Sequence, residues 1–266
     1  MTSPLLLRRA RPALGTLVEV GISIRGKQAG SSPDVRAKAA LEAAFAAVAT
    51  VEHAMSAFDP ASDIGQFNAA PACTTIRVAR ETAIVLRVAH TLGRRSGGLL
   101  DVTLGTGAGA WSLSQRGGQS FLQKGTAEVR LDLGGVAKGH AVDRAFDAIG
   151  ARLDGERGVA WWVNAGGDLR VAGLELPVQL RDERDGGARP WIVLRDGALA
   201  TSYFGPGARV VLAGRRSRRV CHVSVASPRC IWSDALTKVV ALHGGTDHPV
   251  LMRYGASAWL HPVPGA

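Results

Sequence analysis

Residues 131–145 read LDLGGVAKGHAVDRA and join an apolar segment to an amphipathic one through two adjacent glycines. Gly134 and Gly135 permit positive φ angles, so we expect the chain to bend sharply at this point. Apolar side chains at helical spacing after the bend predict a helix over residues 139–153. The N-terminus of a helix has free N–H groups that attract anions, and Lys138 adds a positive charge. The stretch therefore predicts either an ordinary structural turn or a phosphate-binding bend.

Predicted strands and predicted helices both occur on the two sides of this bend. Apolar side chains at period two predict a strand over residues 14–24, and an alanine-rich helical pattern predicts a helix over residues 33–54. A second helix is expected over residues 81–96, because two glycines stop the pattern there. Shorter strands are expected over residues 127–133 and 159–166. Strands in runs together with strands between helices predict an α+β fold with mixed or antiparallel sheets and flanking helices.

The C-terminal part is expected to consist mainly of strands and turns. Residues 168–181 predict strands, and residues 191–204 predict two strands around an Asp-Gly turn. Residues 209–228 have the pattern of a hairpin. A helix is expected over residues 233–243, capped by one of its own first two residues. Residues 250–260 should form the last strand.

Composition excludes several classes of protein. The chain has 266 residues, of which 46% are hydrophobic and 20% charged, so it can bury a sizeable core. Its three scattered cysteines lack a Cys-x-x-Cys pair, and neither a disulfide scaffold nor a zinc site is expected. No apolar run reaches the ~20 residues of a membrane span. The first residues lack the order of a secretory signal, which predicts a cytoplasmic protein, or a periplasmic one only if an upstream export segment has been removed.

The net charge of +10 raises the question of nucleic acid. The densest basic cluster, GRRSRRV at residues 214–220, has no interleaved aromatic residues on which bases could stack. We therefore expect no nucleic-acid partner. A solvated hairpin, or a patch that attracts a phosphorylated small molecule, is the favoured interpretation of this cluster.

Further polar clusters are each compatible with ordinary turn or surface chemistry. Asp101 and Thr103 are alternate residues, so they would share one face of an extended segment. Asp143 is interpreted either as a solvent-facing charge or as a lock onto the preceding strand. Asp234 and Lys238 stand four residues apart and would meet on the surface of a helix. The segment VNAGGDLRVAG is interpreted either as turn chemistry at the end of a buried strand or as part of a site.

Taken together and in this order, the segments resemble those of ApbE-like FAD:protein FMN transferases. The resemblance extends over residues 14–254 and is strongest over residues 100–173. The matching segments are ALGT, MSAFDPASDIGQFN, DVTLGTGAGAW, LDLGGVAKGHAVDRA, VNAGGDLRVAG, ALATSYF and VSVASPRCIWSDALTKVV. The resemblance implies a single domain over residues 1–266, built from two lobes with FAD bound between them. It also implies Mg²⁺-assisted transfer of FMN from FAD to a threonine or serine of a partner protein, with release of AMP.

The resemblance assigns roles to individual residues. The residues expected to contact FAD are Leu14, Phe58, Asp101, Val102, Thr103, Gly134 and His140, and Lys138 joins them through its charge. Metal ligands are expected from the backbone carbonyl of Ala137 and the carboxylate of Asp234. Asp234 is also expected to be catalytic.

Two departures from the family pattern keep alternatives open. The family generally reads Asp-Ala-x-x-Thr, whereas DALTK places Lys238 where the metal-binding threonine stands and Thr237 one residue earlier. Lys238 would then occupy the space of the Mg²⁺ and supply its own charge, or Thr237 would act as the ligand.

The second departure is a missing loop. The stretch His-x-x-Asp-Pro-x-Thr-Gly is absent, which leaves His222 as the candidate acid or base beside Asp234. The arginines expected to replace the loop as phosphate contacts are Arg215, Arg216, Arg218 and Arg219. A non-catalytic FAD-binding protein and an enzyme that hydrolyses the pyrophosphate of FAD are the alternative functions.

Overall fold

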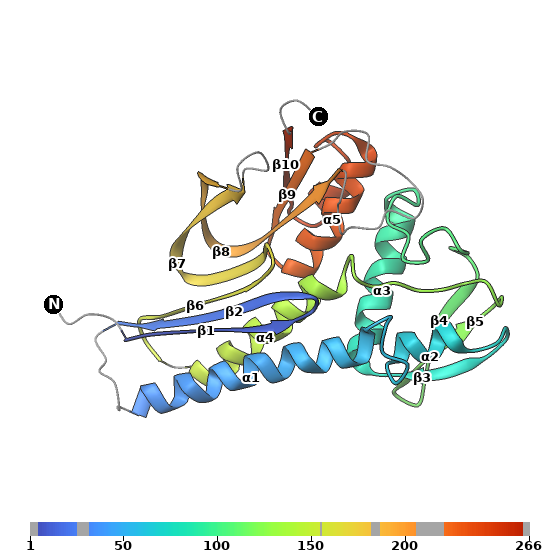
Figure 1. Cartoon of the computed structure of the whole chain (residues 1–266), viewed down its shortest axis with the longest axis horizontal. Coiled ribbons are helices and arrows are strands. Elements are labelled where there is room, and N and C mark those ends of the chain that lie inside the picture. Colours follow the sequence, from blue (N-terminus) through green and yellow to red (C-terminus); the bar gives the residue numbers. More distant parts are fainter. Residues whose placement is uncertain (1–4, 26–31, 155, 182–186, 206–220, 263–266) are drawn as a thin grey trace.

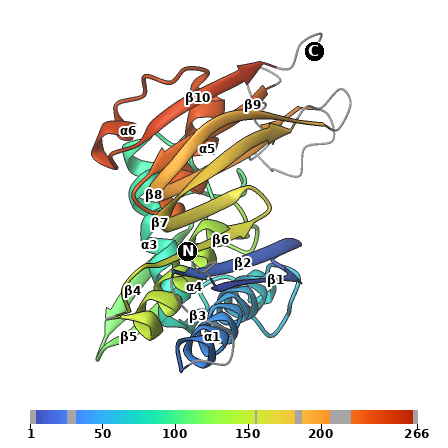
Figure 2. The same ribbon diagram turned by 90° about the vertical axis from the view of Figure 1, so that its left-hand side faces the viewer.

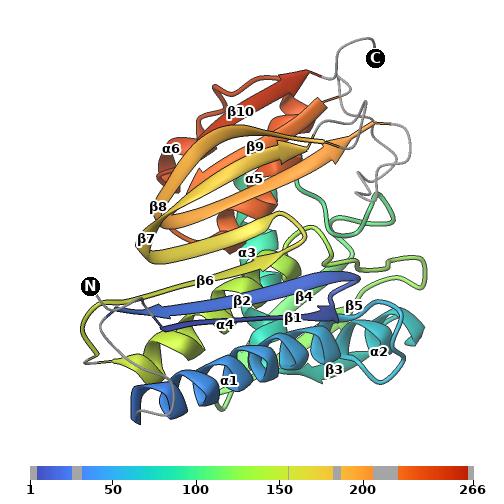
Figure 3. The ribbon, with the colours of Figure 1, turned by 60° about the vertical axis from the view of Figure 1, so that its left-hand side comes forward.

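The computed structural model describes residues 5–25, 32–154, 156–181, 187–205 and 221–262 (Figure 1). The described residues form two sheets. The larger has seven strands in the order β1-β2-β6-β7-β8-β9-β10, and the smaller has three in the order β3-β5-β4. Every strand pairing described is antiparallel. Helices pack against both sheets, so the predicted α+β fold is confirmed. Figure 3 shows the large sheet extending from β1, beside α1, to β10 at the opposite end.

The first half of the large sheet consists of β1 (Leu5–Ala13), β2 (Thr16–Ile24) and β6 (Val159–Ala165). Two long helices, α1 (Ser32–Met55) and α4 (Ala137–Leu153), cover one face of it. The buried side chains that β2 contributes to this core are Val18, Val20, Ile22 and Ile24. Their period of two is the pattern that predicts this strand.

The second half of the sheet consists of β7 (Asp168–Arg181), β8 (Ala188–Phe204), β9 (Cys221–Ser227) and β10 (Ser257–Pro262). Helix α5 (Cys230–His243) lies against one face of these strands (Figure 2). The side chains of Val223 and Val225 on β9 pack in the same core as Ala235 and Leu236 on α5. The α5 face of β9 therefore carries its odd-numbered residues.

The small sheet consists of β3 (Thr75–Val78), β4 (Trp111–Arg116) and β5 (Gln119–Lys124). It packs with α2 (Asp63–Ala69) and α3 (Arg80–Arg95). The remaining short helix is α6 (Val250–Arg253). The core of this part also includes residues of α5 and β9, so it is continuous with the second half of the large sheet. None of the described helices combines the length and apolar character needed to span a membrane.

Several predicted elements need correction. Residues 127–133 form no strand, because their backbone groups bond a side chain and a loop and not a neighbouring strand. The Asn68 side chain of α2 bonds the N–H and the carbonyl of Leu131, at 2.7 and 2.9 Å, and the N–H of Asp132 donates to the carbonyl of Val102 at 2.8 Å. The Asp-Gly turn predicted within residues 191–204 is a kink in one continuous strand. Asp196 has a φ of 36°, and its carboxylate accepts the N–H of Gly173 at 2.8 Å from an irregularity in β7.

The C-terminal elements also differ from the prediction. Helix α5 begins at Cys230, three residues before the expected start, and neither Ser233 nor Asp234 caps it. Helix α6 occupies the first part of the segment expected as the last strand, and β10 follows it. Most of the hairpin predicted over residues 209–228 lies outside the described residues, and only β9 is described.

Candidate functional site

The glycine bend leads directly into the first turn of α4. The N–H groups of Val136 and Ala137 both donate to the carbonyl of Leu133, at 2.8 and 2.7 Å, which tightens the bend. Neither of the two glycines in the bend uses the positive φ that glycine permits. A Cβ at Gly135 would lie 3.3 Å from Cε of Lys238, so the lysine side chain would have to shift by a few tenths of an ångström to admit one.

Helix α5 approaches this first turn very closely. The N–H of Gly139 donates to Oδ2 of Asp234 at 3.0 Å, within the buried contact between α4 and α5. A Cβ at Gly139 would lie 2.4 Å from the carbonyl oxygen of Cys230, so only glycine allows this approach. The N–H groups of Val136, Ala137 and Gly139 are thus bonded within the protein. These three amides therefore do not supply the predicted phosphate contacts in this arrangement, and contacts from other groups of the turn stay a prediction.

The two helices satisfy each other's N-termini. While Asp234 of α5 accepts an N–H from the start of α4, the buried carboxylate of Asp143 on α4 accepts the N–H groups of Cys230 and Ile231, at 3.0 and 3.1 Å. No side chain of α5 itself performs this function. Asp143 therefore acts as a helix cap supplied from outside the helix, and not as a solvent-facing charge.

Two carboxylates and two ammonium groups gather at this junction. Lys238 donates to the carboxylate of Asp234 and also, at 2.9 Å, to its backbone carbonyl. Lys138, one residue before Gly139, pairs with Asp168 at the start of β7. Asp168 and Asp234 are fully buried, and Lys238 is 5% exposed. Oδ1 of Asp168 has no hydrogen-bond partner among the described residues. We call these four residues the ion cluster.

Burial and pairing shift the pKa values in the ion cluster. Burial, with a smaller contribution from the charge of Asp234, raises the pKa of Asp168 to about 6. Burial would likewise raise the pKa of Asp234, but the charges of Lys238 and Lys138 and the Gly139 N–H hold it below its ordinary value. The carboxylates also raise the pKa of Lys138 against the opposite effect of burial. Lys138 and Asp234 are therefore both charged at neutral pH.

The residues expected to bind magnesium do not form a suitable set. Magnesium requires about six oxygen ligands in a nearly octahedral arrangement. Both oxygens of Asp234 are already engaged, one by Gly139 N–H and the other by the Lys238 ammonium. The hydroxyl of Thr237 donates to the backbone carbonyl of Asp234 at 2.7 Å and contacts the Ser202 hydroxyl at 3.1 Å. It therefore faces β8 and the backbone of its own helix.

Side chains that commonly bind metals do not gather elsewhere in the described residues either. These residues include no group of three or more His, Cys, Asp or Glu side chains that could hold a metal ion. The residues present at the junction therefore do not fit a magnesium ion, and Thr237 does not compensate for the lysine at position 238.

Asp101 forms a tight turn beyond the bend. Its carboxylate accepts the N–H and hydroxyl of Thr103, at 2.9 and 2.7 Å, and the N–H of Gly105 at 3.1 Å. Residues 102–105 form a turn and not an extended segment, so Asp101 and Thr103 do not share the face of a strand. Val102 connects this turn to the bend through the bond from Asp132. Gly134 is fixed in turn by a bond from its N–H to Asp132 at 2.7 Å.

Leu14 and Phe58 lie in two loops. Leu14 occupies the β1–β2 turn with a φ of 55°, and its N–H donates to the carboxylate of Glu52 at 2.7 Å. Phe58 is 96% exposed in the segment between α1 and α2. An aromatic side chain this exposed is available to stack on a ring. The flavin contacts assigned to both residues stay predictions.

His140 is anchored to α3. Its Nε2 lies 2.6 Å from the carboxylate of Glu81, which also pairs with Arg144. The ring is almost fully buried, and burial lowers its pKa despite the opposing effect of Glu81. These contacts fix His140 to the protein interior and identify Glu81 as a further residue that positions the start of α4.

The structure separates His222 from Asp234. His222 is an even-numbered residue of β9, opposite Tyr203 of β8, and its ring lies 5.1 Å from the Tyr203 ring between centroids. Ser202 and Val223, the next pair in register, face α5, where Asp234 lies. Successive side chains of a strand point to opposite faces. The expected catalytic pair of His222 and Asp234 is therefore not formed.

Sequence reasoning did not select Asp143, Asp168 and Glu81 as site residues. One sequence signal could have found Asp143, since it stands four residues after Gly139 and so shares the helix face that meets α5. Asp168 directly follows two glycines at the end of a buried strand, and this pattern predicts a turn at its position. The arginines at positions 215, 216, 218 and 219 lie outside the described residues.

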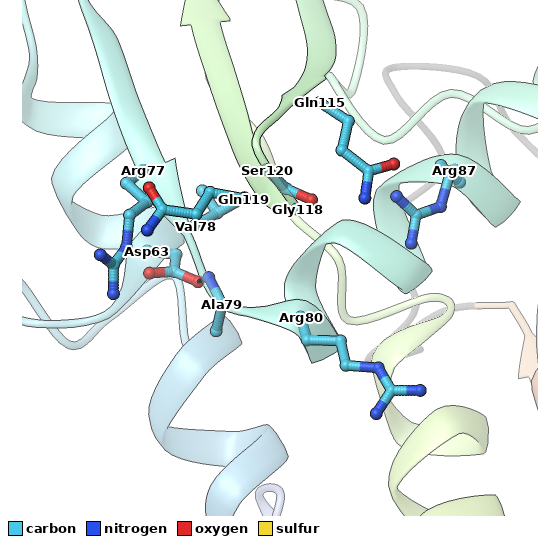
Figure 4. Close-up of a pocket in the computed structure, with 10 residues that line it drawn as sticks. All are labelled: Asp63, Arg77, Val78, Ala79, Arg80, Arg87, Gln115, Gly118, Gln119 and Ser120. Atoms are coloured by element: carbon cyan, nitrogen blue, oxygen red, sulfur yellow. Dashed lines mark hydrogen bonds between the residues drawn. The ribbon is translucent and has the colours of Figure 1, made fainter.

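A separate basic pocket of about 570 Å³ lies beside the small sheet (Figure 4). Arg80 and Arg87 reach it from α3 and Arg77 from β3, as Figure 4 shows. Its carboxylate, Asp63, accepts the N–H of Ala79 and the hydroxyl of Thr82, at 2.8 and 2.6 Å. The pocket can attract anions, but none of the predicted site residues lines it.

Comparison with known proteins identifies the family to which the chain belongs. The sequence pattern of the ApbE family matches residues 14–258, nearly the whole chain. The chain belongs to the ApbE family. No sequence among the curated proteins matches this ApbE-family chain. The two departures noted in its sequence are thus departures within an ApbE-family protein.

Solved structures of similar fold cover almost all of this ApbE-family chain. The ApbE protein of Thermotoga maritima is 22% identical, with a TM-score of 0.76 and coverage of 96% of this chain and 94% of that chain. The flavin transferase ApbE of Vibrio cholerae is 20% identical, with a TM-score of 0.74 and coverage of 97% and 93%. The apo flavinyl transferase ApbE of Pseudomonas stutzeri is 19% identical, with a TM-score of 0.76 and coverage of 98% and 92%. At these identities the likeness establishes the fold.

Proposed function

We propose that the protein is a flavin transferase that moves FMN from FAD to a threonine or serine of a partner protein and releases AMP. Membership of the ApbE family and the names of the similar structures support this function. The observation that carries it is the contact of Asp234 with the first turn of α4, directly beside the glycine bend and two lysines. In this proposal FAD lies between two lobes of a single domain.

The proposed reaction is a phosphoryl transfer. The acceptor hydroxyl oxygen forms a bond to the phosphorus of the FMN half, and its proton is released. The bond from this phosphorus to the bridging oxygen breaks, and AMP leaves with that oxygen. Such a transfer depends on positioning and on neutralising the charge of the phosphates. Lys138 and Lys238 supply positive charge at the junction, and Asp168 and Asp234 hold the two ammonium groups in place.

The experiment that tests the function uses the protein, FAD and an acceptor domain with its target threonine, in buffer containing Mg²⁺. Mass spectrometry measures an FMN adduct on the acceptor, and chromatography measures AMP. We expect both products in equal amounts, and neither adduct nor AMP with an acceptor whose threonine is replaced by alanine. AMP without adduct would identify a pyrophosphate hydrolase. FAD that stays bound and intact would identify a binding protein.

The close approach of α4 and α5 gives a second prediction. Replacement of Gly139 by alanine should push the two helices apart and break the bond to Asp234, because the added Cβ meets the Cys230 carbonyl. We expect the free energy of unfolding to fall by about 1–3 kcal/mol and FAD affinity to fall about tenfold, as measured by denaturant unfolding and by flavin fluorescence.

Gly150 of the same helix provides the matched control for this substitution. A Cβ at Gly150 would meet the Trp161 ring at an ordinary contact distance of 3.4 Å. Gly150→Ala should therefore leave FAD affinity unchanged and keep or slightly raise the stability. Equal effects of the two substitutions would show that the helix contact does not determine the site.

A further inference from the structure

We propose that the ammonium of Lys238 is a built-in cation that takes the place of a divalent metal at the diphosphate of the bound flavin nucleotide. FAD binding and flavin transfer by this protein then need no magnesium. The inference deepens the proposed function and rests on it. It arises because a metal ion requires free oxygen ligands, whereas the carboxylate of Asp234 is already bonded by the Lys238 ammonium and the Gly139 N–H.

The position of Lys238 is the first support. Its side chain extends from α5 toward the glycine bend, where a Cβ at position 135 would lie 3.3 Å from Cε and 3.8 Å from Cδ of the lysine. Its Nζ bonds both the carboxylate and the backbone carbonyl of Asp234. The lysine thus fills the space between the bend and the acidic helix residue, where the resemblance places the cation.

The burial and pairing of Lys238 are the second support. The residue is 5% exposed, and an ammonium is buried in a protein only where a partner compensates the loss of water. The i,i+4 bond to Asp234 fixes its position, unlike that of a flexible surface lysine. A metal ion coordinated by the same carboxylate would be repelled by the adjacent ammonium.

The charge balance of the ion cluster is the third support. Two lysines and two aspartates sum to zero, whereas a divalent cation is bound at sites with net negative charge. Lys138 pairs with Asp168, and Asp234 is paired separately with Lys238. The cluster therefore has no excess negative charge with which to attract a free metal ion.

The test compares the parent protein with K238T and K238M. Flavin fluorescence measures FAD affinity in EDTA and in Mg²⁺, and electron paramagnetic resonance measures binding of Mn²⁺ to the protein without FAD. The parent should bind FAD equally within twofold in both buffers, and should bind no Mn²⁺. K238T should bind FAD about tenfold more weakly in EDTA, recover in Mg²⁺, and bind Mn²⁺.

K238M and an exposed lysine are the controls. K238M keeps the length of the side chain without its charge, so it should lose about tenfold in FAD affinity and gain little from Mg²⁺. K38T replaces an exposed lysine of α1 and should behave as the parent does. Circular dichroism and a melting curve confirm that each variant is folded.

The outcomes that would overturn the inference are distinct from a failure of the proposed function. The inference is wrong if EDTA lowers the parent's FAD affinity about tenfold or more, if the parent binds Mn²⁺, or if K238T gains no metal binding. If the parent neither binds nor turns over FAD in any buffer, the proposed function fails. The Mn²⁺ measurements then still decide whether Lys238 excludes a metal from this junction.

Discussion

Replacement of Asp143 by alanine is expected to lower the free energy of unfolding by about 3–5 kcal/mol. The carboxylate is fully buried and accepts the N–H groups of Cys230 and Ile231 at the start of α5. It also pairs with Arg170 at 2.8 Å and with Arg229 at 3.4 Å. Its removal leaves the two N–H groups of α5 without their hydrogen-bond acceptor and the two guanidinium groups without this carboxylate partner.

Thermal unfolding measures the effect. In a protein of this size about 1 kcal/mol corresponds to about 2–4 °C, so the melting temperature of Asp143→Ala should fall by about 6–20 °C. The matched control is Asp147, one turn later, whose side chain is 36% exposed and pairs with the same two arginines. Asp147→Ala should cost at most about 1 kcal/mol. A melting temperature of Asp143→Ala within 2 °C of the parent would contradict the capping role.

Replacement of Asp234 by asparagine should reduce the rate of flavin transfer on the order of 10²-fold. Asparagine retains an oxygen that can accept the Gly139 N–H, so the helices keep their contact. The substitution removes the negative charge that holds Lys238 and contributes to the charge balance with Lys138. Lys238 then loses its carboxylate partner and its fixed position, while Lys138 stays paired with Asp168, so the cluster has one positive charge in excess.

The rate is measured as FMN adduct formed on the acceptor in single-turnover mixtures at saturating FAD. Asp247 provides the control, because its side chain is 88% exposed and pairs with His243 at the opposite end of α5. Asp247→Asn should transfer flavin at the parental rate. An Asp234→Asn protein that is folded and equally fast would place the reaction elsewhere in the molecule.

Sequence patterns predicted most of the long elements of the fold and missed strand β1 and the strands of the small sheet. Strand β2 and helix α3 have strong periods of two and 3.6, and both were predicted to within a few residues. The strands of the small sheet are four to six residues long and mostly exposed, so their apolar pattern is weak. The segment over residues 127–133 is apolar at alternate positions, yet its backbone bonds the Asn68 side chain of α2 and a loop instead of a neighbouring strand.

The candidate site was predicted where it depends on local sequence and missed where it depends on distant contacts. The bend and the acidic residue of α5 were found from the motifs that carry the family resemblance. The pairing of Asp143 with residues 230 and 231 joins positions 87 and 88 residues apart, which periodicity cannot reveal. His222 was assigned to the site although the apolar residues Val223 and Val225 mark the opposite parity of β9 as the core face.

Because α4 and α5 each supply a carboxylate to the start of the other helix, the first turns of the two helices form one cooperative unit. Each helix start depends on a carboxylate from the other, so neither can fray while its neighbour stays ordered. Amide protons at positions 139, 230 and 231 should therefore become accessible to deuterium in a single opening event. A flavin nucleotide would bind at a rigid, preformed part of the molecule. Local unfolding there would disrupt the first turns of both helices together.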